Sequence, residues 1–328
     1  MVSKFRVFVT REIPAAGIEL LRGECDVSVN PDDRVLTSVE IASGARGAEG
    51  LLCLLTDTVD DALLEGMPTV RVIANYAVGF NNIDVGAATR RGIPVSNTPG
   101  VLTETTADMA WSLLMAASRR IAEGDKFTRA GSFAGWGPML LLGQDVYGKT
   151  LGLVGMGRIG EAMVRRARGF GMRILYFDTV RRSPADEAAL GIEYRELDAL
   201  LGEADHVSLH VPLSPETRHL ISARELSLMK PSATLVNTSR GPVLDEAALA
   251  QALRRGTIFA AGLDVFEEEP KVHPGLMDLS NVVLVPHIAS ATIDTRTKMA
   301  TMATANLLAG LRGEPMPNIV NPEAFASQ

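Results

Sequence analysis

The sequence predicts an α/β protein with two doubly wound parallel-sheet domains, and three observations support this prediction. Short apolar segments that are typical of strands alternate with amphipathic segments that are typical of helices. This order occurs in two successive sets, which favours two open parallel sheets with helices on both faces. The length of 328 residues and the 46% content of hydrophobic residues are enough for two such cores.

The first set of strand-like segments fills the first third of the chain. Its members lie at 5–9, 27–29, 50–53, 70–75 and 93–95, with helix-like segments between them, for example at 15–21 and 83–91. The second set begins at 151–154. Its further members lie at 172–177, 206–210, 234–236, 258–263 and 282–285. Each set is long enough to form one doubly wound sheet.

Composition and charge exclude several classes of function. The 32 basic and 39 acidic residues give a net charge of −7, which argues against a nucleic-acid-binding surface. Two cysteines, Cys25 and Cys53, fit neither a disulfide framework nor a metal cage, so we expect a cytoplasmic location. No apolar run is long enough to cross a bilayer, and residues 1–10 resemble a first strand rather than a targeting segment.

A glycine-rich turn follows the apolar segment 151–154 and precedes a helix-like segment at 161–170. Its glycines, Gly155, Gly157 and Gly160, have the spacing that allows a tight turn, close approach of a phosphate and close helix packing. Asp178 ends the next strand, where its carboxylate can bind a ribose and repel a 2′-phosphate. The alternative is a plain turn with a solvated aspartate. The order of strand, turn, helix, strand and acid favours a Rossmann-type dinucleotide site instead.

Two further helix-like segments link the two sets. Residues 101–130 predict one long helix, capped by Thr103 or Thr105, that crosses between the domains. Residues 292–313 predict a helix that returns to the first domain. We therefore expect a discontinuous, flavodoxin-like substrate-binding domain at 1–100 plus 290–328. A Rossmann-type dinucleotide-binding domain follows at 101–289, with a cleft between the two.

The helix at 101–130 has more apolar residues than one contact surface requires. Two explanations fit about equally well: the helix lies at a subunit interface, or it is well buried within its own domain. Residues 131–148 follow it and are rich in glycine, yet they include Trp136 and the apolar run 140–142. Such a segment is too apolar for a free linker. These two segments predict a homodimer.

Three polar side chains follow strands of the second set, at the sheet edge where open α/β sheets bind ligands. Arg240 offers a planar fork for a carboxylate, although a surface ion pair is about as common for an arginine. Glu269 is distinguished from its two glutamate neighbours by Pro270, which favours an extended backbone before it. His287 follows a buried strand and is the natural proton donor near neutral pH.

Other reaction classes are disfavoured. His206 and His210 are spaced four residues apart, but they lie in a strand pattern without an obvious third ligand, so we expect no metal site. The Gly-x-Ser-x-Gly elbow of serine hydrolases does not occur in the sequence.

At this level of detail the chain resembles the D-2-hydroxyacid dehydrogenase family over essentially its full length. The matching motifs are VGMGRIG at 154–160, NTSRGPVLDEAAL at 237–249, AGLDVFEEEP at 261–270 and PHIASAT at 286–292. The run NYAVGFNNIDV at 75–85 is similar to the family's substrate loop. Residues 129–152 are most similar to the glyoxylate and hydroxypyruvate reductase branch.

The resemblance implies a hydride transfer between a nicotinamide and a small 2-oxo acid. Arg240 would bind the substrate carboxylate, His287 would donate the proton, and Glu269 would orient His287. The other residues implied in substrate binding are Leu54, Val78, Gly79 and Ser290. Those implied in cofactor binding are Thr106, Gly155, Gly157, Arg158, Ile159, Gly160, Asp178, Thr179, Arg181, Val211, Pro212, Thr217, Thr238, Ser239, Arg240, Asp264 and His287.

Finer choices stay open at this point. Asp178 favours NAD(H), while Arg181 and Arg182 keep NADP(H) possible. Glu269 argues for a 2-hydroxy acid, because formate dehydrogenases carry glutamine at this place. The alternatives are another D-2-hydroxyacid dehydrogenase, a phosphite dehydrogenase, or a dinucleotide-sensing protein without enzymatic activity.

Overall fold

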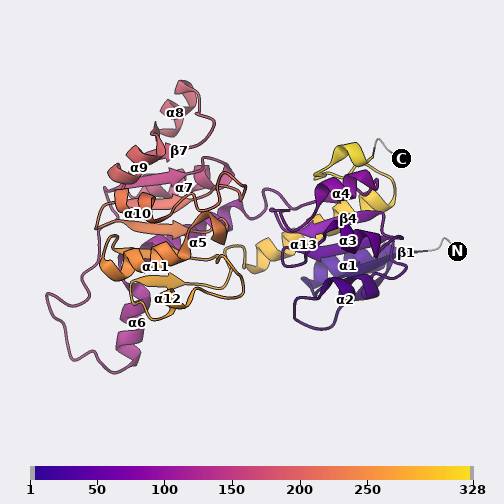
Figure 1. Cartoon of the computed structure of the whole chain (residues 1–328), viewed down its shortest axis with the longest axis horizontal. Helices are drawn as coiled ribbons and strands as arrows, with labels where there is room; N and C mark the ends of the chain where they lie inside the picture. Colours follow the sequence, from indigo (N-terminus) through magenta and orange to yellow (C-terminus); the bar gives the residue numbers. More distant parts are fainter. Residues whose placement is uncertain (1–3, 326–328) are drawn as a thin grey trace. The chain divides into compact units, whose positions relative to one another are not determined.

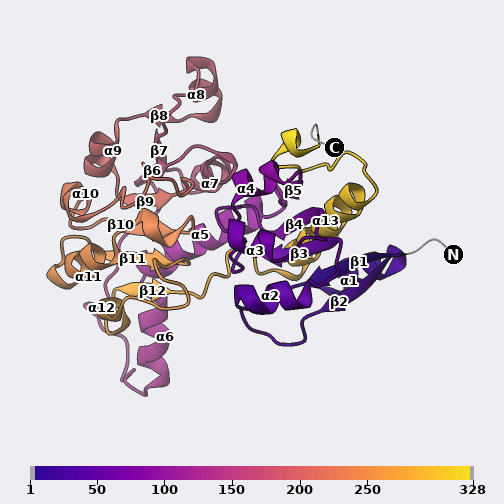
Figure 2. The same ribbon diagram turned by 45° about the vertical axis from the view of Figure 1, so that its right-hand side comes forward.

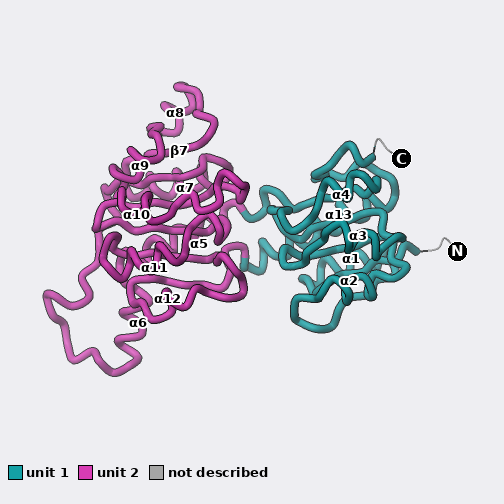
Figure 3. Tube along the Cα trace, in the orientation of Figure 1, with its two compact units in different colours: residues 1–102, 291–328 teal, residues 103–290 magenta. Residues whose placement is uncertain are grey.

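The computed structural model describes residues 4–325, and the chain divides into two compact units (Figures 1 and 3). The first unit comprises Met1–Leu102 and Ala291–Gln328, and the second comprises Thr103–Ser290. Each unit contains one sheet whose strands pair in parallel, with helices packed on it. The predicted fold class is therefore confirmed.

The first unit is built on a five-stranded sheet with the order β2-β1-β3-β4-β5. Its strands are β1 Phe5–Val9, β2 Cys25–Val29, β3 Gly50–Leu54, β4 Val72–Tyr76 and β5 Val95–Ser96. Its helices are α1 Ala15–Glu24, α2 Ser38–Gly44, α3 Asp61–Glu65, α4 Val85–Arg90 and α13 Ile293–Leu311, with a 3-10 turn, η2, at Pro322–Ala324. All five strands that the sequence predicts for this region occur, with ends that differ by a few residues.

Successive side chains of β1 point to opposite faces of the sheet, and each face carries its own apolar core. Val7 and Val9 face the helices α1 and α13, whereas Phe8, between them, packs on the opposite face. Figure 2 shows α13 beside β3 and β4. The N-terminal cap of α13 is Thr292, whose hydroxyl accepts a hydrogen bond from the N–H of Thr295 at 3.2 Å. Helix α13 thus belongs to the first unit, whose sheet it covers.

The second unit is built on a seven-stranded sheet with the order β12-β11-β10-β9-β6-β7-β8. Its strands are β6 Thr150–Val154, β7 Arg173–Phe177, β8 Glu193–Tyr194, β9 His206–Leu209, β10 Thr234–Asn237, β11 Ala260–Leu263 and β12 Val282–Leu284. Its helices are α5 Thr103–Ser118, α6 Ile121–Arg129, α7 Arg158–Gly169, α8 Pro184–Leu190, α9 Leu197–Glu203, α10 Ala223–Leu228, α11 Glu246–Arg255 and α12 Pro274–Met277, with a 3-10 turn, η1, at Gly241–Val243. The chain order reverses between β6 and β9, which is where such sheets bind ligands.

The prediction of one helix over 101–130 is wrong. The structure has two helices, because α5 ends at Ser118 and Arg120 adopts a left-handed φ of +54°. The carbonyl of Ser118 accepts the N–H of Gln144 at 2.8 Å, and its hydroxyl bonds Thr234 at 3.1 Å. These tertiary contacts fix the end of α5, and Figure 1 shows α6 extending away from the sheet.

The segment after α6 leaves large apolar side chains exposed within this chain. Trp136 is 86% exposed and Met139 is 77% exposed. The packing that the sequence predicts for 131–148 is therefore not provided by the chain itself. Within residues 4–325, no helix is both long and apolar enough to span a membrane.

Candidate active site

The glycine-rich turn joins β6 to α7 at the carboxyl edge of the seven-stranded sheet. Gly155 has a φ of +99°, and a Cβ at this position would lie 2.7 Å from the carbonyl carbon of His210. A Cβ on Gly160 would lie 2.4 Å from the carbonyl oxygen of Gly155, so the helix and the turn are in direct contact. Gly157 is the N-cap of α7 and has no atom within 4 Å of its Cβ position. The start of the helix is thereby open to an anion.

Asp178 lies directly beside this turn. Its Oδ2 accepts the N–H of Met156 at 2.7 Å, and its Oδ1 accepts the N–H of Val180 at 3.3 Å. The exposed Thr179 donates its hydroxyl to the same carboxylate at 3.4 Å. The carboxylate is therefore fixed beside the glycine-rich turn.

The two arginines after this carboxylate are engaged differently. Arg181 donates to Glu187 at 2.8 and 2.9 Å and lies over the ring of Tyr194. Arg182 donates from Nη2 to the carbonyl of Met156 at 2.6 Å and to Glu161 at 2.5 Å. Of the two arginines named from the sequence, Arg182 therefore contacts the glycine turn, whereas Glu187 holds Arg181.

The other residues predicted to bind the cofactor lie on α5, on the first turn of α7 or just after β9 and β10. Thr217 donates its hydroxyl to the carbonyl of Pro212 at 2.6 Å, which closes the loop after β9. Thr238 follows β10, and its buried hydroxyl has no hydrogen-bond partner among residues 4–325. A buried hydroxyl without a partner is costly, and a polar ligand at this edge would satisfy it. The remaining members are Thr106, Arg158, Ile159, Val211 and Ser239. This donor set fits a dinucleotide.

Arg240 is presented by the loop between β10 and η1. Its carbonyl accepts the side-chain amide of Asn237 at 2.9 Å, and its Nη1 donates to the carbonyl of Ser239 at 2.7 Å. A Cβ on Gly241 would lie 1.9 Å from the backbone of Phe266, so only glycine allows this close approach. The approach brings Arg240 beside the segment that carries Glu269. Burial lowers the pKa of Arg240, and the charge of Glu269 opposes this effect.

His287 and Glu269 form a hydrogen-bonded pair. The distance from Nδ1 of His287 to Oε2 of Glu269 is 2.8 Å, and Oε1 of Glu269 accepts the N–H of Phe266 at 3.0 Å. His287 has a left-handed φ of +52°, and its N–H donates to the carbonyl of Asp264 at 2.9 Å. Because Nδ1 is engaged by Glu269, Nε2 is the ring nitrogen that can face a substrate.

The surroundings of Glu269 stabilise its charged form. Burial raises the pKa of Glu269, but the hydrogen bond and charge of His287, the N–H of Phe266 and the charge of Arg240 outweigh it and leave the pKa lowered. Glu269 is therefore an anion near neutral pH. Its carboxylate therefore holds the ring of His287 through a charge-assisted hydrogen bond to Nδ1.

Asp264 fixes the loop that carries His287. It is completely buried at the end of β11, and its two oxygens accept the N–H groups of Ile288 and Ala289 at 2.6 and 2.9 Å. Burial raises the pKa of Asp264, although these two N–H groups oppose the shift. Ser290 follows in the same loop and is half-buried.

Asparagine side chains hold the predicted substrate residues of the first unit, which are Leu54 at the end of β3 and Val78 and Gly79 in the loop after β4. Asn82 donates to the carbonyl of Leu54 at 3.0 Å, Asn97 to that of Val78 at 2.7 Å, and Asn75 to that of Gly79 at 2.9 Å. Asn75 also donates to Asn82 at 3.1 Å. The carbonyls of Val78 and Gly79 thus accept hydrogen bonds, whereas their N–H groups make no hydrogen bond within residues 4–325. Two such N–H groups can bind a carboxylate.

The histidines set aside from the sequence have structural partners. His206 bonds the carbonyl of Asp145 at 3.0 Å, and His210 bonds Ser208 at 2.9 Å. Burial lowers the pKa of His210 to about 4, so it is neutral near pH 7. In the part of the chain that the structure describes, no group of three or more His, Cys, Asp or Glu side chains is arranged to hold a metal ion.

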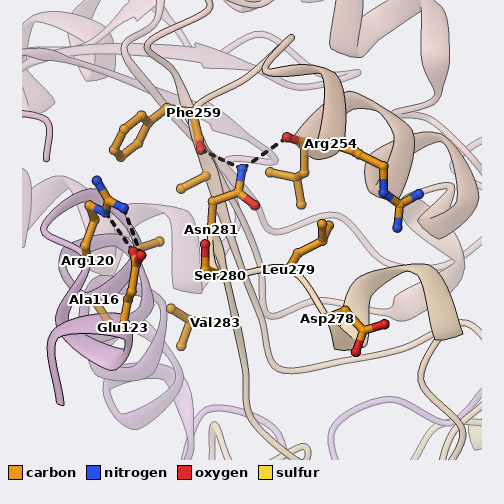
Figure 4. Close-up of a pocket in the computed structure, with 13 residues that line it drawn as sticks. Ala116, Arg120, Glu123, Arg254, Phe259, Asp278, Leu279, Ser280, Asn281 and Val283 are labelled. Atoms are coloured by element: carbon orange, nitrogen blue, oxygen red, sulfur yellow. Dashed lines mark hydrogen bonds and ion pairs between the residues drawn. The ribbon is translucent and has the colours of Figure 1, made fainter. Parts of the chain in front are cut away.

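A separate cavity of about 430 Å³ lies at the opposite edge of the same sheet, where β11 begins (Figure 4). Arg120 and Glu123 pair on one side of it, and Asn281 donates to the carbonyl of Phe259 at 3.1 Å on the other. Because the glycine turn and His287 lie at the carboxyl edge, this cavity is not part of the candidate site.

Comparison with known proteins shows the family. Residues 111–289 match the model of the D-isomer specific 2-hydroxyacid dehydrogenase, NAD binding domain. The glyoxylate reductase of Korarchaeum cryptofilum is 53% identical over 98% of this chain and 97% of that protein. The chain belongs to the D-2-hydroxyacid dehydrogenase family.

Solved structures of similar proteins cover both units of this dehydrogenase. The glyoxylate reductase of Paecilomyes thermophila is 34% identical, with a TM-score of 0.85 over 98% of this chain and 99% of that one. The NADPH-dependent glyoxylate/hydroxypyruvate reductase of Sinorhizobium meliloti, solved with NADP and malonate, is 33% identical, with a TM-score of 0.87 over 98% of each chain. The predicted family resemblance is confirmed.

Sequence reasoning missed the asparagines that hold the substrate loops of this dehydrogenase. Asn75 lies within β4, while Asn82 and Asn97 lie in loops, and none belongs to a periodic pattern. The signal for Asn75 and Asn82 is their place within the run 75–85, which is similar to the family's substrate loop, whereas Asn97 lies outside this run.

Proposed function

We propose that this dehydrogenase uses NAD(P)H to reduce glyoxylate or hydroxypyruvate to the 2-hydroxy acid. The observation that carries the proposal is the 2.8 Å pair of His287 and Glu269, which lies beside Arg240 at the sheet edge that bears the glycine turn. The names of the relatives in Korarchaeum cryptofilum and Sinorhizobium meliloti support this choice of substrate.

The proposed mechanism assigns one task to each side chain. When bound, the reduced nicotinamide supplies the hydride. Arg240 binds the substrate carboxylate through its planar fork and polarises the carbonyl. His287 donates the proton from Nε2 to the carbonyl oxygen, which becomes the hydroxyl group. Glu269, bonded to Nδ1, orients the ring and stabilises the imidazolium before the transfer.

We assign substrate binding to the first unit and dinucleotide binding to the second. This keeps the predicted division into 1–100 plus 290–328 and 101–289. The unengaged N–H groups of Val78 and Gly79 are suited to the substrate carboxylate, and Leu54 is suited to its remaining atoms. A cytoplasmic location stays a prediction from the cysteine content.

We propose that NADH is preferred over NADPH. The carboxylate of Asp178 is held at the glycine turn, where it would bind a ribose and repel a 2′-phosphate. The charge of Arg182 is paired with Glu161 at 2.5 Å, which weakens its attraction for a phosphate.

The test is a spectrophotometric assay of four substrates (glyoxylate, hydroxypyruvate, pyruvate and phosphite) with each cofactor at low concentration. We expect the highest kcat/KM with NADH and either glyoxylate or hydroxypyruvate. Clearly better use of NADPH contradicts the cofactor choice, and fastest NAD⁺ reduction with phosphite contradicts the substrate choice. Tight NADH binding without turnover of any substrate indicates a dinucleotide-sensing protein.

We also propose a homodimer through 101–130 and 131–148. The exposed side chains Phe133, Trp136, Met139 and Leu142 form the apolar surface that a second copy would cover. Sedimentation velocity at micromolar concentration should show a dimer, and Trp136→Ser should shift it toward the monomer. A monomer in the unaltered protein would refute this proposal.

A further inference from the structure

Glu246 is a buried carboxylate that the mechanism does not use. It is the first residue of α11 and is only 3% exposed. Its Oε1 accepts the N–H of Glu267 at 2.6 Å, and its Oε2 accepts the N–H of His273 at 3.1 Å. In return, the N–H of Glu246 donates to Oε1 of Glu267 at 2.9 Å.

These bonds hold the two ends of one short segment, residues 267–273. Glu269 lies inside this segment, and its Oε2 bonds Nδ1 of His287 at 2.8 Å. The segment lies between β11 and α12, and within it the N–H of Lys271 donates to the carbonyl of Glu268 at 2.9 Å, which closes a tight turn. This bond lies inside the segment, whereas the bonds of Glu246 tie both of its ends to α11.

We propose that Glu246 is a positioning residue, which fixes residues 267–273 at both ends so that Glu269 stays aligned with His287. The proposal rests on the proposed reductase function. Glu246 touches neither of the two side chains, and its effect on the reaction passes through the backbone of this segment.

A carboxylate suits this task better than an amide. Two N–H donors converge on the side chain of Glu246, and a carboxylate can accept both. In glutamine, one of the two oxygens becomes an NH₂ group that faces a donor, so one hydrogen bond is lost in a buried place.

Other ionisable groups surround Glu246 and His287. Glu267 and His273 face Glu246, and Glu267 also bonds Nε2 of His219 at 2.6 Å. Around His287, the charged neighbours are Glu269, Asp264 and, through Glu269, Arg240. A displaced Glu269 would no longer hold the ring of His287 through Nδ1, so Nε2 would lose its alignment for proton transfer.

The test compares Glu246→Gln with a matched control, Glu225→Gln. Glu225 lies in the first turn of α10 in the same unit, and its contacts are the N–H of Ser222 at 3.0 Å and Arg224 at 2.9 Å. We expect E246Q to lower kcat about tenfold with little change in KM. E225Q should keep both parameters near those of the unaltered enzyme.

A double-mutant cycle separates positioning from general damage. If Glu246 acts through Glu269, then E246Q adds little further loss in an E269Q background. Additive losses, or a kcat of E246Q equal to that of E225Q, would overturn the proposal. Should E246Q fold poorly, Glu246→Asp keeps the charge, shortens the side chain and gives the same comparison.

Hydrogen exchange distinguishes failure of this proposal from failure of the proposed function. Amide exchange in 267–273 should be faster in E246Q than in E225Q, whether or not the protein turns over glyoxylate. Unchanged exchange overturns the positioning role by itself. If the unaltered protein lacks reductase activity but exchange in 267–273 is still faster in E246Q than in E225Q, the role of Glu246 is supported and only the proposed reaction is contradicted.

Discussion

His287→Ala is expected to lower kcat for glyoxylate reduction by about two to four orders of magnitude, because it removes the proposed proton donor. The substrate oxygen must gain a proton as carbon gains hydride, and Nε2 of His287 is the nitrogen left available by the 2.8 Å bond from Nδ1 to Glu269. Binding of NADH should change little, because the glycine turn and Asp178 lie at other strands. Stopped-flow turnover and NADH fluorescence titration measure the two effects.

A second variant is needed because the backbone of His287 is left-handed. Its φ of +52° strains alanine, whereas asparagine tolerates this region, so His287→Asn separates loss of the imidazole from loop distortion. His219 offers a matched control, because it also has a left-handed φ and a 2.6 Å bond to a glutamate. His219→Asn should keep turnover within about threefold. Near-normal turnover of both His287 variants would remove His287 from the mechanism.

The elements that the sequence predicts well are those with local signals. Buried parallel strands such as β6 and β10 are continuous apolar runs, and the three glycines at 155–160 have a spacing that only a tight turn requires. The division of 101–130 into α5 and α6 has no such signal. It depends on Gln144 and Thr234, which contact Ser118 from distant parts of the chain. The two-residue strand β8 is too short to show a pattern.

In the candidate site, too, the sequence indicates some features and not others. The rule that ligands bind at strand ends points to Arg240 and His287, and Pro270 distinguishes Glu269 from its glutamate neighbours. The structure places these three side chains close to one another. The contacts that align them were not foreseeable. Gly241 touches the backbone of Phe266, and Glu246 holds the segment of Glu269, through interactions between residues more than twenty positions apart. Such contacts follow from the tertiary fold alone.

Arg240→Gln is expected to lower kcat/KM for glyoxylate by about two to three orders of magnitude, mainly through a higher KM. A bidentate, charge-assisted contact to the substrate carboxylate is lost, and each such hydrogen bond contributes about 1.5–3 kcal/mol. The fold should tolerate the change, because the carbonyl of residue 240 still accepts the amide of Asn237. Steady-state kinetics over a wide range of glyoxylate concentrations measures both parameters.

Two further variants make the assignment of Arg240 specific. Arg240→Lys keeps the charge but loses the planar fork, so it should recover only part of the loss. Arg254→Gln is a matched control, because Arg254 lies on α11 at the opposite sheet edge and donates to the carbonyl of Gly275 at 3.2 Å. It should leave KM unchanged. If R240Q also has an unchanged KM for glyoxylate, the carboxylate binds elsewhere, and the N–H groups of Val78 and Gly79 become the primary anchor of the substrate.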